Sequence, residues 1–94
     1  MTTTNINVEG FDLQVIDNAV DWYVLERYSA IVSDPDKAVV HLAWLARRLI
    51  ANWDDVLAQV AEAHGSADIP TCTRLIIRAM AVASGGTSEG DAKN

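Results

Sequence analysis

Two histidines, one cysteine and a few carboxylates are the residues of this sequence that could do chemistry. His41 and His64 would point about 140° apart on one helix, so they cannot share a metal ion there. Cys72 lies among apolar residues at helical spacing, which is typical of a core residue rather than a nucleophile. The carboxylates of the adjacent Asp54 and Asp55 would diverge on a helix. The sequence therefore predicts no catalytic constellation, no metal site, no cofactor and no enzymatic activity.

Trp44 is the strongest candidate for a binding residue. On a helical wheel it lies about 160° from the middle of the apolar stripe, beside Lys37, His41 and Arg48. A tryptophan among basic side chains, away from the core, has the composition favoured at binding hot spots. We therefore predict a partner-binding patch of these four residues. The alternative is that an N-terminal helix, a hairpin or a second subunit covers this face and buries Trp44.

Residues 60–78 loosely resemble a helix-turn-helix, which offers a DNA-binding alternative. The second helix would carry four polar or basic residues: Thr71, Thr73, Arg74 and Arg78. The resemblance covers under a quarter of the chain, and its turn, which contains Pro70, is longer than the usual motif. The net charge of -6 also disfavours contact with nucleic acid. A protein partner is therefore favoured over nucleic acid.

The element that must carry Trp44 is the most regular part of the sequence. Its apolar positions recur at three- and four-residue steps: Val39, Leu42, Ala43, Ala46, Leu49, Ile50, Trp53, Leu57, Val60, Ala61 and His64. This unbroken phase predicts one long central helix over 35–64, roughly 45 Å long. The alternative is two helices, because Arg47 and Arg48 suit a helix end while residues 52–55 suit a capped helix start.

Other helices are predicted on either side of this segment. A helix from Asp17 to Val32 should stop before Pro35, with Asp17 favourably placed at the positive end of its dipole. Gly65 should end the central helix, and a last helix should start near Pro70 or Thr71. Its predicted buried stripe is Cys72, Leu75, Ile76, Ala79, Val82 and Ala83. Residues 5–15 alternate around Glu-Gly and predict either a short β-hairpin or an extended arm.

The composition places these elements in one domain. Half of the 94 residues are apolar and about a fifth are charged, so we expect a mainly all-α fold of three to four helices over residues 1–84. Residues 85–94 are rich in glycine and polar side chains, which predicts a disordered tail. The sequence predicts no membrane segment and no signal peptide, and its single cysteine suits the cytoplasm.

The number of apolar positions exceeds what so short a core can hide, which predicts a homodimer. The sequence thus favours a cytoplasmic, non-enzymatic protein-protein interaction module, such as a bacterial or phage regulator, adaptor or inhibitor. An enzyme whose site forms only between subunits is a further alternative.

Overall fold

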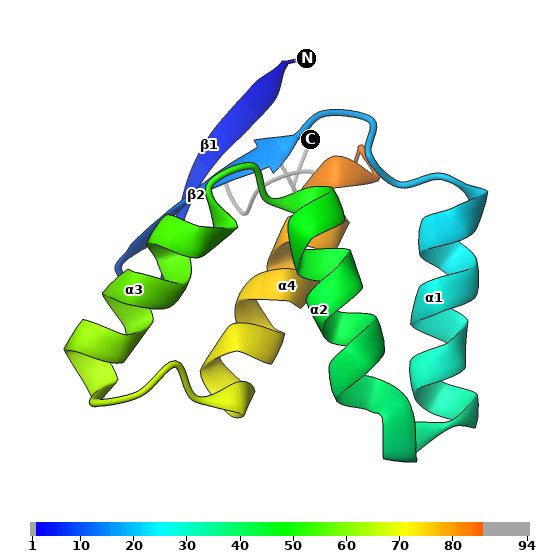
Figure 1. Cartoon of the computed structure of the whole chain (residues 1–94). Helices are drawn as coiled ribbons and strands as arrows, with labels where there is room; N and C mark the ends of the chain where they lie inside the picture. Colours follow the sequence, from blue (N-terminus) through cyan, green and yellow to red (C-terminus); the bar gives the residue numbers. More distant parts are fainter. Residues whose placement is uncertain (1, 86–94) are drawn as a thin grey trace.

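The chain forms an N-terminal β-hairpin followed by four α-helices (Figure 1), in a computed structural model that describes residues 2–85. In chain order the elements are β1 (Thr3–Val8), β2 (Phe11–Ile16), α1 (Trp22–Ser33), a 3-10 turn (Pro35–Lys37), α2 (Ala38–Leu49), α3 (Trp53–His64) and α4 (Ile69–Ala83). The predicted mainly helical fold with an N-terminal hairpin is confirmed. The tail predicted over residues 85–94 lies outside the described residues except for Gly85.

The hairpin has the register that the alternation of apolar residues predicted. Val8 pairs with Phe11, and Ile6 pairs with Leu13. Both turn residues adopt positive φ, 55° and 89°, as a two-residue turn between right-twisted strands requires. One face of the hairpin contributes buried side chains to the core, and its other face is polar and exposed. The arm that was the alternative to a hairpin is therefore excluded for residues 3–16.

The predicted long helix over 35–64 is wrong, because the chain leaves the helical path after α2. Ile50 adopts extended backbone angles (φ −122°, ψ 112°) and forms an antiparallel bridge with Val15 of β2. The Ala51 N–H then donates to the Gln14 carbonyl at 2.8 Å. The free edge of β2 thus holds residues 50 and 51 through one isolated bridge and one backbone hydrogen bond, and the chain leaves the helical path here.

Asn52 completes the break between α2 and α3. Its Oδ1 accepts a hydrogen bond from the Gln14 N–H at 2.9 Å, and its Nδ2 donates to the Asp12 carbonyl at 3.0 Å. A single amide side chain therefore continues the ladder along β2 and fixes where α3 begins. The two-helix alternative is the correct one, and a bundle around one long central helix is not what the structure shows.

Helix α1 starts later than predicted and is the least buried of the four helices. Its N-cap is Asp21, whose Oδ1 accepts from the Val24 N–H at 3.1 Å. Asp17 precedes the helix, and its Oδ1 accepts from the Thr4 hydroxyl at 2.7 Å, so the predicted dipole role of Asp17 is wrong. The helix stops before Pro35 as predicted, and only Val24 among its residues is buried.

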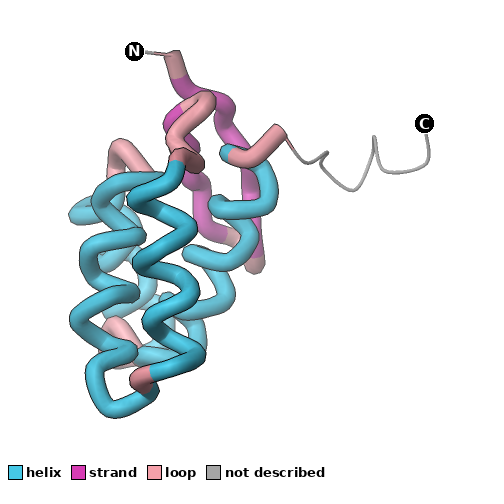
Figure 2. The backbone as a smooth tube through the Cα atoms, turned by 90° about the vertical axis from the view of Figure 1, so that its right-hand side faces the viewer, coloured by secondary structure: helices cyan, strands magenta, loops and turns pink. Residues whose placement is uncertain are grey.

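The core lies between the hairpin and α2, α3 and α4, while α1 packs against α2 on the outside (Figures 1 and 2). Gly65 ends α3 with φ 83°, as predicted, and Asp68 caps α4 by accepting from the Thr71 N–H at 3.0 Å. The predicted stripe of α4 is buried apart from Val82, which is half-buried. Within residues 2–85 no helix is long and apolar enough to cross a membrane.

Candidate functional site: an apolar groove between α2, α3 and α4

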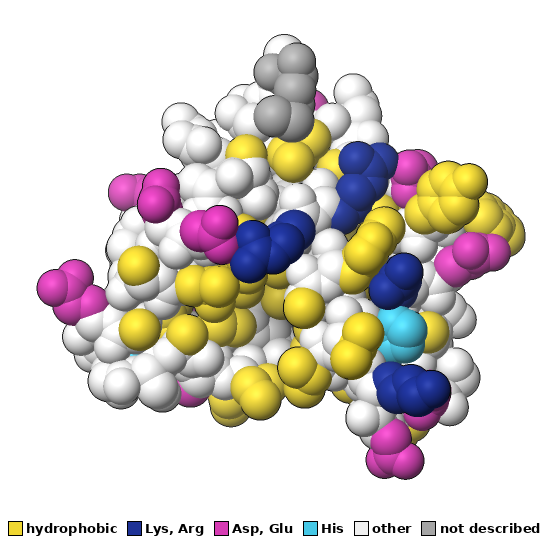
Figure 3. All heavy atoms as spheres, in the orientation of Figure 1, with side chains coloured by type: hydrophobic (Ala, Val, Ile, Leu, Met, Phe, Trp, Pro, Cys, Tyr) yellow, Lys and Arg dark blue, Asp and Glu magenta, His cyan; other side chains and the backbone are white. Residues whose placement is uncertain are grey.

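An apolar groove runs between α2 and α3, with α4 as its floor. Its volume is about 220 Å³. Eleven residues line it: Val39, Leu42, Ala43, Arg47, Trp53, Leu57, Ala67, Ile69, Cys72, Thr73 and Ile76. Figure 3 shows hydrophobic side chains spread across this face, over α3, α4 and α2. Val39 of α2 and Ile69 at the start of α4 are each 57 % exposed, so the edge of the groove presents apolar surface to solvent.

The helix break creates this groove. On one continuous helix Val39, Ala43 and Leu57 would share a single apolar face, which is why the sequence predicted them as core. Because residues 50–52 turn the chain along β2, α3 runs back beside α4 instead of extending α2 (Figure 1). Much of the predicted stripe is buried, including Ala46, Leu49, Ile50 and Val60, but the stripe missed two fully buried residues, Leu45 and Val56. Val39 and Ala43 are left exposed along the groove.

One sequence signal could have revealed the groove. Basic residues at the end of α2 are followed within a few residues by Asn52 and two aspartates, the usual sign of one helix ending and another starting. If each of two helices has its own apolar face, so small a domain cannot bury both faces completely. If two helices are inferred from this signal, the apolar residues that the core does not cover become candidates for an exposed binding surface.

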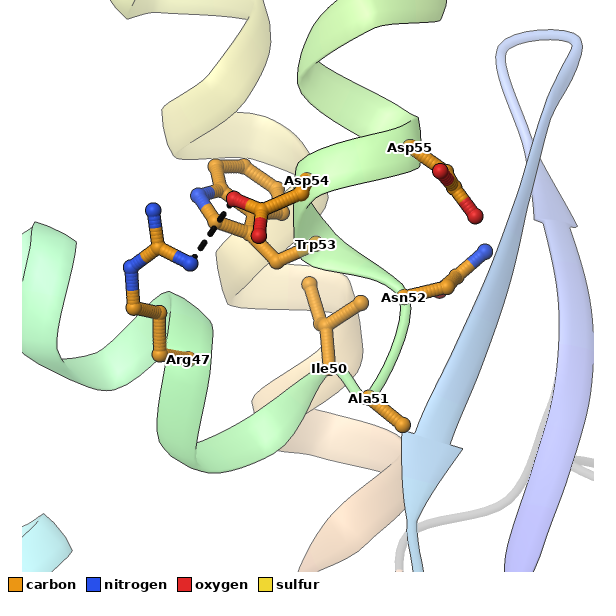
Figure 4. Close-up of a pocket in the computed structure, with 7 residues that line it drawn as sticks. All are labelled: Arg47, Ile50, Ala51, Asn52, Trp53, Asp54 and Asp55. Atoms are coloured by element: carbon orange, nitrogen blue, oxygen red, sulfur yellow. Dashed lines mark hydrogen bonds and ion pairs between the residues drawn. The ribbon is translucent and has the colours of Figure 1, made fainter.

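A charged pair marks one end of the groove. Arg47 of α2 donates from Nη1 to Asp54 Oδ1 of α3 at 2.8 Å, across the break (Figure 4). Their side chains are 60 % and 78 % exposed, so this ion pair contributes little to stability and can exchange partners easily. Asp55 lies away from this pair, toward Asn52 and the hairpin, as expected for adjacent residues on a helix (Figure 4). The groove therefore combines an apolar interior with a polar rim.

The chemistry of the groove is that of a binding surface. Cys72 is buried in its floor, and loss of solvation raises the pKa of its thiol. A thiol that is kept protonated is a poor nucleophile. No three His, Cys, Asp or Glu side chains lie close enough to hold a metal ion anywhere in residues 2–85. What the groove offers a ligand is apolar contact and an exposed ion pair.

The predicted patch around Trp44 is not an open surface. Trp44 is mostly buried against the core, and the Arg27 guanidinium of α1 lies over its ring, 4.7 Å from the centroid. His41 and Trp44 line a small hollow of about 170 Å³ together with α1. The prediction that Trp44 projects into solvent is therefore wrong. The alternative, in which an N-terminal helix covers this face, is correct, because α1 packs on this face of α2.

The other two residues of that patch, Arg48 and Lys37, have surroundings different from those of Trp44. Arg48 donates from Nη2 to Asp21 Oδ2 at 2.7 Å, which ties the end of α2 to the N-cap of α1. The hydrogen bond from the Val24 N–H, followed by that from Arg48, lowers the pKa of Asp21. Lys37 is exposed on the 3-10 turn. Partner binding by the four residues stays a prediction, and a partner at Trp44 would have to displace Arg27.

Two residues of the helix-turn-helix alternative, Thr71 and Arg74, are buried or paired within the fold. Thr71 is 2 % exposed, which leaves it out of reach of a base. Arg74 donates from Nε and Nη2 to the Glu9 carboxylate at 2.7 and 3.0 Å, and this pairing lowers the pKa of Glu9. The bidentate pair fastens the hairpin tip to α4. His64, close by, lies 3.1 Å from Asp68 Oδ1 and meets the Phe11 ring edge-on.

Comparison with known proteins gives no relative to which this site could be assigned: no family model, no curated protein and no solved structure matches the chain.

Proposed function

We propose that the protein is a non-enzymatic cytoplasmic interaction module that binds the aliphatic face of a helix from another protein in the groove between α2, α3 and α4. A bacterial or phage regulator, adaptor or inhibitor would act in this way. The observation that carries the proposal is a pair of exposed apolar residues at the edge of the groove, Val39 of α2 and Ile69 at the start of α4, beside an apolar interior. Large apolar patches on a surface usually mark binding sites.

The size and chemistry of the groove support a helix as its ligand. Its volume of about 220 Å³ is below the range of about 300–1,000 Å³ that is usual for small-molecule sites. It has room for a few aliphatic side chains, such as those that project from one face of a helix. Few hydrogen-bonding groups line it, so an extended peptide would find little to satisfy its backbone. The Arg47–Asp54 pair can bind charges of either sign beside the apolar face.

The test is a titration of the full chain, labelled at Ile, Leu and Val methyls, with a defined amphipathic peptide. The peptide carries Leu and Ile on one helical face and Glu and Lys on the other. Methyl shifts should cluster at Val39, Leu57, Ile69 and Ile76, the residues of the groove. Shifts that spread evenly, or that gather on the hairpin or on α1, would refute the proposal.

Two neighbouring valines supply a matched pair of variants. Val39 lines the groove and Val40, which is 62 % exposed, does not. Val39→Glu should weaken the peptide by about tenfold or more, since a carboxylate would be desolvated in the contact. Val40→Glu should change the affinity by less than about twofold. Equal effects of the two variants would contradict the proposed site. A photoreactive residue at position 39, with position 40 as control, would then capture the natural partner.

A further inference from the structure

A second apolar surface lies on α1, on the side that faces away from α2. At about 100° per residue, Trp22, Leu25, Ser29 and Val32 share one face, centred about 180° from Arg27, which contacts Trp44 of α2. We name these four residues the α1 seam. Trp22 is 71 %, Leu25 49 % and Val32 75 % exposed. A helix that turns such residues outward lacks a cover on that side.

We propose that the α1 seam is where two copies of this chain associate, with their α1 helices antiparallel about a two-fold axis. This inference is independent of the groove and of its ligand. The homodimer that the sequence predicts rests on the number of apolar positions, which does not say which surface forms the contact.

The spacing of the seam is symmetric, as a two-fold contact requires. Its steps are three, four and three residues, so reversing the helix about position 27 superimposes the seam on itself. Trp22 then faces Val32 of the second copy, and Leu25 faces Ser29. Each large side chain meets a small one, which lets the two helices approach closely. A parallel pair would instead stack Trp22 on Trp22 and align the two helix dipoles unfavourably.

Trp22 is already prepared for such a contact. Its indole Nε1 donates to Glu26 Oε2 on the same helix at 2.8 Å. The polar edge of the ring is therefore satisfied within one copy, and the ring can be covered without leaving an unpaired donor. A side chain held in this way also loses less rotamer freedom when it binds.

The exposed area of the α1 seam can be compared with the area that a specific dimer contact buries. From their exposed fractions, the three apolar seam residues and the flanking Tyr28, which is 42 % exposed, present roughly 500 Å² of side-chain surface per copy. If the contact covered all of it, these residues of two copies would together remove at most roughly 1,000 Å² of accessible surface from water, and specific interfaces start near that value. A second copy of the chain carries the same apolar surface, and the symmetric spacing of the seam lets the two surfaces contact each other.

Sedimentation of the full chain between about 1 and 100 μM tests the proposal, with a pair of exposed valines as variants. Wild type should sediment as a dimer. Val32→Lys places a charge in the seam and should raise the dimer Kd by about tenfold or more. Val40→Lys, at a valine of α2 that is 62 % exposed and lies outside the seam, should leave the Kd within about twofold. A monomeric wild type, or equal effects of the two variants, would overturn the proposal.

Mixing two variants tests the antiparallel register. Trp22→Glu and Val32→Lys should each be monomeric alone. In an antiparallel heterodimer the acid introduced at position 22 of one copy faces the base introduced at position 32 of the other. The remaining pair, Trp22 of one copy and Val32 of the other, is native. The mixture should therefore form a dimer that weakens as salt rises. If both variants keep the thermal midpoint of the monomer and yet fail to associate when mixed, the antiparallel seam is wrong.

Discussion

Trp44 shows what a helical wheel can and cannot say about one residue. The wheel correctly placed Trp44 opposite the stripe of its own helix, but it carries no information about what packs on the far side. The structure places Arg27 and the rest of α1 there. By the same reasoning Val39 was predicted to be core and is 57 % exposed. The residue types were therefore informative at both positions, and the missing information was which element covers which face.

Trp44→Ala should destabilise the fold by about 2–3 kcal/mol, because it removes a mostly buried ring and the cation–π contact with Arg27. The measurement is urea unfolding, made in the Val32→Lys background so that association contributes nothing. Trp22→Ala is the matched control, since Trp22 is 71 % exposed and should change the free energy of unfolding by no more than about 0.5 kcal/mol. Equal, small effects of both substitutions would return Trp44 to the solvent-exposed patch.

At the scale of elements, the sequence predicted the hairpin and its register, whereas it offered the helix break only as the alternative to one long helix. The hairpin is local: its alternation and its Glu-Gly turn specify the register over a few residues. The break is tertiary, because it depends on the free edge of β2, which lies more than 30 residues away in sequence. The apolar phase also stays unbroken across residues 50–52, so periodicity alone points to one helix. The capping residues were the only local sign of two helices.

Asn52 should be the residue that holds this break in place. Asn52→Ala removes two hydrogen bonds to β2 and should lower the free energy of unfolding by about 1–2 kcal/mol. Hydrogen exchange should show the reason, since the Gln14 amide, which donates to Asn52, should exchange faster while the Val24 amide of α1 is unchanged. Asn5→Ala, an exposed asparagine on the same hairpin, is the control and should have little effect. An unchanged Gln14 amide would mean that the Ile50 and Ala51 backbone bonds suffice.

At the scale of the whole molecule, the two proposed surfaces lie on opposite sides of α2. α3 and α4 lie on one side of α2 and α1 lies on the other (Figures 1 and 2). The groove is formed on the side of α3 and α4, and the α1 seam is on the face of α1 opposite to Arg27, which contacts α2. A dimer through α1 would therefore leave both grooves open and facing away from the contact. Most of the exposed large apolar side chains belong to one of these two surfaces, while Tyr23, Val40 and Ile77 belong to neither. The assembled protein would thus be bivalent.

Bivalency gives the two proposals a joint test. A tandem probe carries two copies of the amphipathic peptide on a flexible Gly/Ser linker of about 60 residues, whose r.m.s. span is roughly 45 Å. Fully extended, the linker would reach roughly 200 Å, several times the longest dimension of one chain, 37 Å, so it can reach both grooves of a dimer. The tandem probe should bind wild type at least about tenfold more tightly than the single peptide, because its second half binds at a raised effective concentration. Calorimetry would measure both affinities.

In Val32→Lys, which we expect to be monomeric, this gain should disappear while the affinity of the single peptide stays the same. In Val39→Glu both probes should weaken, although the dimer remains. The two variants therefore separate the surfaces, since one removes only the gain and the other removes the binding itself. A tandem gain that survives in a monomeric Val32→Lys would show two peptide sites on one chain, contrary to a single groove. No gain in a dimeric wild type would mean that the dimer covers at least one groove, and the α1 seam would then be the wrong contact.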